Sequence, residues 1–130
     1  MRELLLTIDV ECYEALNVKG QEKEVVLVQF GGTACGDYFS GSVIGTGTDT
    51  QKYDLKSGSK CLSARYILEG RDRDGKQCRI FIENELNSEN CWHPMLVTDS
   101  NCLSPWEKLA LTATVDSTDK GVVVRIYSCT

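Results

Sequence analysis

A two-residue alternation of apolar and polar side chains recurs along this chain and constrains its fold more than any other feature. It is clear in "LLLTIDVEC", residues 4–12, and it is the period of a β-strand that buries one face. Similar runs are rich in β-branched and aromatic residues and are separated by clusters of Gly, Asp, Asn or Ser. The sequence therefore predicts about nine strands, at residues 4–12, 22–31, 37–45, 50–55, 60–70, 76–85, 94–100, 106–115 and 121–129.

Helical signals are few. Residues 11–20 could form one turn or a short helix that ends at Gly20, and Ser104 and Pro105 favour a single turn before the next strand. The sequence has no fixed repeat and no linker, so the strands should form one domain over residues 1–130. Because closure removes unpaired strand edges, we expect a single antiparallel β-barrel, all-β, lipocalin/calycin-like in outline, with at most one short helix.

Charge and hydropathy exclude several classes of protein. The net charge is −5 and the 14 Lys and Arg residues are scattered, which argues against binding to nucleic acid. The apolar runs are far shorter than the roughly 20 residues of a membrane span. The first residues carry acidic groups and no small-residue cleavage site, so the sequence predicts a cytoplasmic protein without a signal peptide.

Seven cysteines are present, and they lack the two-residue spacing of zinc ribbons. We expect reduced, mostly buried thiols and neither a metal nor a cofactor. The alternative is a metal site formed by Cys91, His93 and Cys102.

Residues 63–85, "SARYILEGRDRDGKQCRIFIENE", predict a hairpin with a defined register. "DRDGK" is typical of a type I turn followed by a left-handed glycine, Gly75. If the two residues that flank this turn pair with each other, the other cross-strand partners follow by counting along the two strands. One side then carries the opposite-charge pairs Arg65–Glu83 and Glu69–Arg79, and the other side carries an apolar surface.

The charged side of this hairpin has two interpretations. On a solvated face, each ion pair would contribute a few tenths of a kcal/mol to stability. On the inner face of a barrel, Arg65 and Glu83 would have to remain paired and could orient a polar ligand. The alternation alone does not choose between them.

Several segments of this chain resemble a known family. They are the glycine-rich "YFSGSVIGTGTDTQ", then "SARYILEG" with its "DG" turn and "IFIENE", then "HPMLVTDS" and Trp106 before the last hairpin. In this order they resemble the domain of unknown function family 3237, a bacterial family of uncharacterised proteins, over residues 37–127. The most specific parts are "GTGTD" and "ARY" with the following asparagine. The resemblance implies a small antiparallel β-barrel and no particular activity.

By position, the resemblance implies polar site residues at Asp49, Arg65, Asn84 and Thr98, with Trp106 as an accompanying aromatic residue. It also favours an Arg65 that points into the barrel. The hairpin register, however, places Asn84 on the opposite side from Arg65, which requires either a bulge near Glu83 or a structural role for one of them. This chain departs from the family pattern in having "ELN" after Asn84, and in a weaker aromatic segment near "CWHPML".

Three functions remain open. The first is binding of an unknown small organic molecule in the barrel, with Arg65, Glu83, Asn84, Asp49, Thr98, Trp106 and His93 as candidate ligand-binding residues. The second is an isomerase, cyclase or hydrolase that uses Asp49, Glu83 or His93 as acid and base. The third is a structural oligomeric module, for which a homodimer is the simplest form.

Overall fold

The protein is built almost entirely from β-strands. The computed structural model describes residues 2–86 and 90–129. In order, its elements are β1 (Arg2–Lys19), β2 (Lys23–Cys35), β3 (Phe39–Asp54), β4 (Lys60–Asp72), β5 (Gln77–Leu86), β6 (Trp92–Thr98), the 3-10 helix η1 (Ser104–Lys108), β7 (Leu111–Ser117) and β8 (Gly121–Cys129). No helix within the described ranges is long and apolar enough to cross a membrane.

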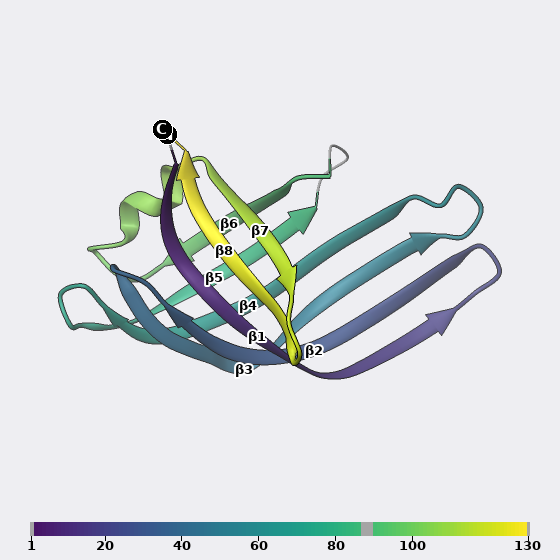
Figure 1. Ribbon diagram of the computed structural model, residues 1–130, viewed down its shortest axis with the longest axis horizontal. Coiled ribbons are helices and arrows are strands. Elements are labelled where there is room, and N and C mark those ends of the chain that lie inside the picture. Colours follow the sequence, from purple (N-terminus) through teal and green to yellow (C-terminus); the bar gives the residue numbers. More distant parts are fainter. Residues whose placement is uncertain (1, 87–89, 130) are drawn as a thin grey trace.

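The strands form one closed barrel in which each pairs antiparallel with its neighbours in sequence, and β8 returns to pair with β1. The β1–β2 and β3–β4 hairpins extend far on one side, while η1 and the C-terminus lie at the opposite end (Figure 1). We refer to these as the hairpin end and the η1 end. The predicted all-β antiparallel barrel is confirmed.

Within residues 2–86 and 90–129 there are eight strands rather than about nine. Residues 37–45 and 50–55, predicted as separate strands, belong to one strand, β3. The expected break is an irregularity in the β3–β4 register between Ile44 and Thr48, where Gly45 takes a φ of 62°. A bulge of this kind bends a strand without ending it.

The possible helix at residues 11–20 is also absent. This segment stays in β1, because it pairs with β2 as far as Lys19 and absorbs a bulge between Cys12 and Glu14. The single turn predicted at Ser104 is confirmed as η1, although Leu103 occupies the N-cap position and β7 begins only at Leu111.

The β4–β5 hairpin has the predicted register, with Tyr66 opposite Ile82 and Arg65 opposite Glu83. Its turn is closed by backbone hydrogen bonds to and from Asp72, and Gly75 has a φ of 78°, which favours glycine. Because the pleat alternates faces, this register places every second residue of β4 inside the barrel.

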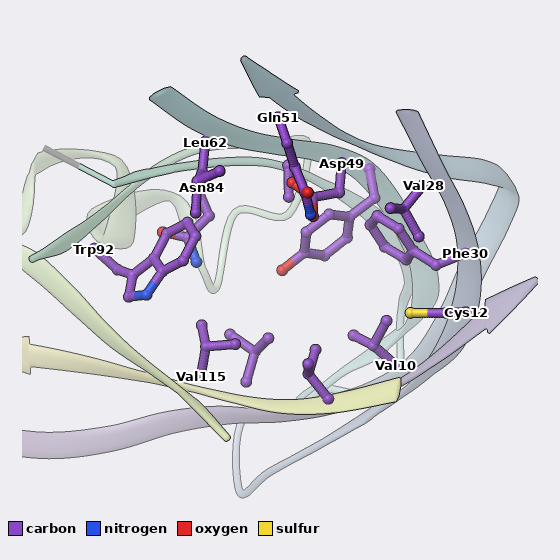
Figure 2. A pocket seen from close by; sticks show the side chains of 14 residues that line it. Val10, Cys12, Val28, Phe30, Asp49, Gln51, Leu62, Asn84, Trp92 and Val115 are labelled. Atoms are coloured by element: carbon purple, nitrogen blue, oxygen red, sulfur yellow. The ribbon is translucent and has the colours of Figure 1, made fainter. Parts of the chain in front are cut away.

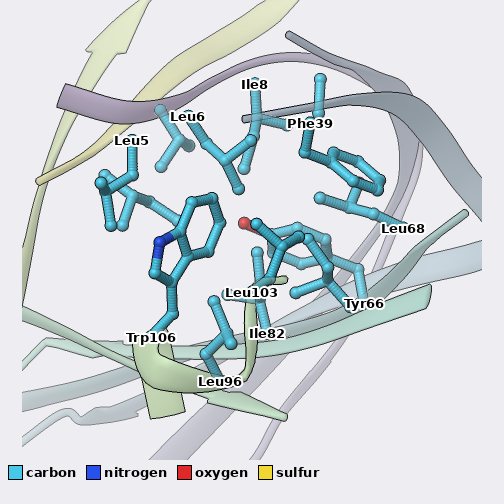
Figure 3. Packing of buried hydrophobic residues seen from close by; sticks show 14 of the residues in the cluster. Leu5, Leu6, Ile8, Phe39, Tyr66, Leu68, Ile82, Leu96, Leu103 and Trp106 are labelled. Carbon is cyan, nitrogen blue, oxygen red and sulfur yellow. The ribbon is translucent and has the colours of Figure 1, made fainter. Parts of the chain in front are cut away.

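The buried core fills the η1 end of the barrel. Figure 3 shows Trp106 of η1 packed into this end among leucine side chains from several strands. The fully buried residues Leu6, Leu68, Ile80, Ile82, Leu103 and Ile126 lie in the same cluster. The barrel is therefore packed at the η1 end.

The cysteines are more exposed than predicted. Only Cys78 is buried and Cys102 is half-buried, while the other five are exposed to solvent. The prediction of mostly buried thiols is wrong, because several cysteines occupy outward positions of strands or segments near strand ends.

Candidate functional site: a cavity at the hairpin end

Beyond the packed core, toward the hairpin end, the barrel contains a cavity of about 290 Å³. Its wall is mostly apolar, with valines from β1, β2, β7 and β8 and with aromatic rings (Figure 2). Four residues of the wall carry oxygen atoms in their side chains: Asp49, Gln51, Tyr66 and Asn84. A concave, mainly apolar site with a few polar groups is the usual form of a small-molecule site.

The strand register brings two of these polar residues to one level of the barrel. Val28 pairs with Asp49, Asp49 with Ala64, and Ala64 with Asn84, so four adjacent strands contribute one inward row. Strands are spaced about 4.8 Å apart, which puts the backbones of Asp49 and Asn84 roughly 10 Å apart. Because Ala64 between them has a small side chain, the space in front of it remains open.

Asp49 is the central acid of the cavity. Gln51 Nε2 donates a hydrogen bond to its Oδ2 at 2.9 Å, and Tyr53 Oη donates to Gln51 Oε1 at 2.7 Å. These three residues alternate along β3, so all face inward and form a chain that orients the carboxyl. The other oxygen, Oδ1, is buried and has no partner within the described part of the chain.

Burial raises the pKa of Asp49 above its ordinary value of 3.8, and the hydrogen bond from Gln51 opposes part of this shift. The reason is that a partly dry, mostly apolar cavity disfavours the charged form. Asp49 is therefore a carboxyl group whose proton is held more tightly than at the protein surface.

The floor of the cavity is aromatic. Phe30 and Tyr66 meet edge to face with ring centroids 5.4 Å apart, and the ring of Phe30 occupies the space where a side chain at Gly47 would lie. Burial raises the pKa of the Tyr66 hydroxyl, so this group stays protonated and remains a hydrogen-bond donor. Its oxygen has no partner among residues 2–86 and 90–129.

The remaining polar groups surround the same space. Asn84 is buried, and its Oδ1 has no hydrogen-bond partner in the described segments. Figure 2 shows Trp92 beside Asn84 and Cys12 on the far side of the cavity. Desolvation, followed by the charge of Asp49, raises the pKa of the Cys12 thiol, so Cys12 is not an activated nucleophile.

Unpaired buried acceptors are costly, at about 1–3 kcal/mol each. The carboxyl of Asp49 and the amide of Asn84 both border the cavity, and each turns about a terminal side-chain bond. A ligand that supplies donors would therefore provide the hydrogen bonds that these two acceptors do not make within the described part of the protein.

Three of the predicted site residues lie on the outer face of the barrel. Arg65 Nε binds Glu83 Oε2 at 3.0 Å, and the Arg65 side chain is 61% exposed. His93 is also exposed. The expectation that Arg65 points inward is wrong, because β4 continues without a bulge through this pair and Ala64 and Tyr66 occupy the inward positions. The solvated ion pair is the correct interpretation.

Thr98 and Trp106 lie at the η1 end, away from the cavity. Thr98 Oγ1 donates to the carbonyl of Arg79 at 2.8 Å, and its N–H donates to Glu107 at 2.9 Å, so it holds the end of β6. Trp106 is part of the packed core. Of the predicted residues, only Asp49 and Asn84 line the cavity. In the described part of the chain, no group of three or more potential metal ligands comes together.

Sequence reasoning missed Gln51, Trp92 and Cys12 as cavity residues. Gln51 could have been found, since it lies two positions after Asp49 and shares its face in any strand. Cys12 shares the alternating face of residues 4–12 with Val10, but the alternation does not show that this end of the face borders a cavity. Trp92 carries no such signal, because it opens a short strand.

Replacing Asp49 with asparagine should stabilise the protein near pH 7 by about 1 kcal/mol, because a partly buried charge is removed; solvent screening keeps the effect small. The pKa of Asp49 is higher in the folded protein than in the unfolded chain, so the wild type loses stability as the pH rises from the ordinary carboxyl pKa through the raised pKa of the folded protein. The difference in free energy of unfolding between the variant and the wild type should vanish below about pH 4, where Asp49 is protonated in both states. Urea unfolding at several pH values measures it. A variant less stable than wild type near neutral pH would contradict this prediction.

No protein-family model and no curated protein matches this sequence. Solved structures do match it. A protein of unknown function from Clostridium acetobutylicum ATCC 824 has a TM-score of 0.82 and 19% identity, over 100% of this chain and 97% of that one. A structure described as that of an enzyme from Penicillium herquei has a TM-score of 0.77 and 17% identity, covering 98% and 92%.

A third similar structure is described as a beta-barrel like protein from Acinetobacter baumannii AYE. It has a TM-score of 0.73 and 17% identity, and the match covers 98% of this chain and 94% of that one. At such identities the likeness establishes a shared fold. This chain is thus a small β-barrel similar in fold to a protein of unknown function, to a protein described as an enzyme and to a protein described as beta-barrel like.

Proposed function

We propose that this protein binds a small, mainly apolar organic molecule in the cavity at the hairpin end of the barrel. The observation that carries the proposal is the combination of an apolar wall with buried, unpaired oxygen atoms of Asp49, Asn84 and Tyr66. Eight-stranded barrels are wide enough to hold one small ligand. Membership of the domain of unknown function family 3237 is part of the same proposal.

The polar groups favour one class of ligand. The cavity wall contains a carboxyl, two amides and a tyrosine hydroxyl, and no Arg or Lys side chain among its described residues. Without a cation, a buried carboxylate on the ligand would stay unpaired, which is costly. The ligand should therefore be neutral or cationic and should carry a hydroxyl or N–H group.

Two matched compounds test this proposal. 2-Naphthol and 2-naphthoate share a bicyclic apolar ring but carry a hydroxyl and a carboxylate, respectively. We expect 2-naphthol to raise the unfolding temperature near pH 7 in a concentration-dependent way, and 2-naphthoate to leave it unchanged. Stabilisation by 2-naphthoate alone would contradict the proposed chemistry, and stabilisation by neither would contradict binding of this class.

Neighbouring residues of β4 provide the matched variants. Ala64→Phe fills the cavity from the inner face and should abolish the stabilisation by 2-naphthol. Arg65→Ala changes the next residue, on the outer face, and should leave the stabilisation intact. The reverse pattern would place the ligand outside the cavity.

A second candidate function is proton transfer, and the raised pKa of Asp49 favours it. An oriented carboxyl could remove a proton from the carbon next to a ligand carbonyl and return it, while the protonated hydroxyl of Tyr66 donates to the carbonyl oxygen. The similar fold of the Penicillium herquei enzyme is compatible with catalysis in such a barrel.

2-Tetralone in D2O tests this second candidate, because its acidic C–H groups exchange with solvent and NMR follows their loss. We expect the protein to accelerate the exchange. Asp49→Asn should lower the protein-dependent exchange rate at least a hundredfold, as loss of a general base does. If exchange runs at the rate seen in buffer alone, and 2-naphthol binds in the separate unfolding assay, the protein binds ligands of this class but does not catalyse this proton transfer.

A further inference from the structure

An apolar row crosses the outer face of the barrel over four adjacent strands. Ile44 of β3 pairs with Ile67 of β4, Ile67 with Phe81 of β5, and Phe81 with Val97 of β6. We call these four residues the outer apolar row. Val97 is 51% exposed and Ile67 37%, while Ile44 and Phe81 are half-buried. Single exposed apolar residues are ordinary, whereas a contiguous row is typical of a contact surface.

Four charged residues surround the centre of this row. On β4, Arg65 and Glu69 lie two positions to either side of Ile67, and on β5, Glu83 and Arg79 lie likewise beside Phe81. We call these four residues the charged square. Two of its sides are ion pairs, Arg65–Glu83 at 3.0 Å and Arg79–Glu69 at 2.9 Å, and every corner is next to a charge of opposite sign.

A charged square with alternating signs is complementary to a second copy of itself. In a face-to-face homodimer, the two-fold axis lies in the plane of the interface. If this axis runs along the strands between β4 and β5, Arg65 meets the partner's Glu83 and Glu69 meets the partner's Arg79.

The same rotation brings the apolar groups together. Ile67 then meets the partner's Phe81, and Val97 meets the partner's Ile44. An axis along the outer apolar row gives the same match of signs, because Arg65 then meets the partner's Glu69. Either way, an apolar centre is surrounded by complementary charges, which is the common anatomy of an interface.

We propose that this face, the outer surface of β3 to β6, joins two copies of the protein into a homodimer. The inference does not rest on ligand binding, since the cavity opens inside the barrel at the hairpin end. Because the outside of a barrel is convex, the contact should be at the small end of specific interfaces, with a dissociation constant in the micromolar range.

Two charge-reversal variants test the proposal. Arg65→Glu with Arg79→Glu makes the square wholly negative, and Glu69→Arg with Glu83→Arg makes it wholly positive. Each variant should dimerise roughly a hundredfold more weakly than wild type, because like charges then face each other. An equimolar mixture of the two should form a heterodimer. Sedimentation velocity over a concentration series measures the wild type, the two variants and their mixture.

The exposed ion pairs contribute little to folding, so both variants should remain folded, and circular dichroism checks this. Leu16→Asp with Leu27→Asp is the matched control, since these residues form a separate exposed apolar pair on the β1–β2 hairpin. It should leave the dimer intact. A monomeric wild type in the micromolar range, a control that dissociates, or a mixture of variants that stays monomeric would each overturn the proposal.

Discussion

Replacing Trp106 with alanine is expected to lower the free energy of unfolding by about 4 kcal/mol, because truncation of a buried tryptophan leaves a large hole. Trp106 is only 6% exposed, and its ring meets Tyr38 edge to face at 5.7 Å. In the packed end of the barrel, its leucine neighbours cannot collapse into the space without moving strands (Figure 3). Urea unfolding near pH 7 measures the change.

Trp92→Ala is the matched control, since it removes the same side chain from the wall of the cavity. Trp92 is half-buried and already borders open space, so its loss should destabilise by about 1 kcal/mol, in the range of an ordinary substitution. Equal losses for the two variants would contradict the division of the barrel into a packed and a hollow end.

Gly70→Ala is expected to destabilise by about 3 kcal/mol, the upper part of the range for overpacking. Gly70 of β4 pairs with Gly41 of β3, and the strands approach so closely there that a Cβ at Gly70 would overlap the backbone carbonyl of Ser40. The obstacle is the main chain of β3, so a change of rotamer cannot relieve it. The strands would have to separate. Thermal and urea unfolding measure the loss.

Gly45→Ala controls for the effect of losing a glycine as such. Apart from its two chain neighbours, no atom of the described residues lies within 4 Å of a Cβ at this position, but the φ of 62° is unfavourable for alanine. The expected loss is about 1 kcal/mol, the cost of the left-handed conformation. A Gly70→Ala variant no less stable than Gly45→Ala would show that the β3–β4 pairing relaxes easily.

The turn chemistry of the sequence determined how well each part of the fold could be predicted. The β4–β5 hairpin was predicted pair by pair, because the "DG" turn fixes a register from which all other pairs follow. The β3 strand was predicted as two strands, because the glycines at Gly45 and Gly47 signal a break as readily as a bulge. Bulges depend on the neighbouring strands, which a single sequence does not show.

The candidate site was predictable only in part. Asp49 and Asn84 were named separately, but their position on one level of the barrel depends on pairing across β3, β4 and β5. For Arg65, the alternation of β4 showed which residues share its face but did not choose between the outer and the inner face, and the family resemblance favoured the inner face. The structure places Arg65 on the outer face, because Ala64 and Tyr66 occupy the inward positions of β4 and the pleat turns the residue between them outward.

The unequal filling of the barrel has a consequence for how such a protein can diversify. Residues at the η1 end make the contacts on which folding depends, whereas many at the hairpin end border empty space. Substitutions such as Val115→Leu or Leu62→Val would then change the shape of the cavity while leaving the core contacts in place. If the cavity binds a ligand as proposed, its preferences could change by single steps, each compatible with a folded chain. The same property makes the hairpin end a practical starting point for engineered binders.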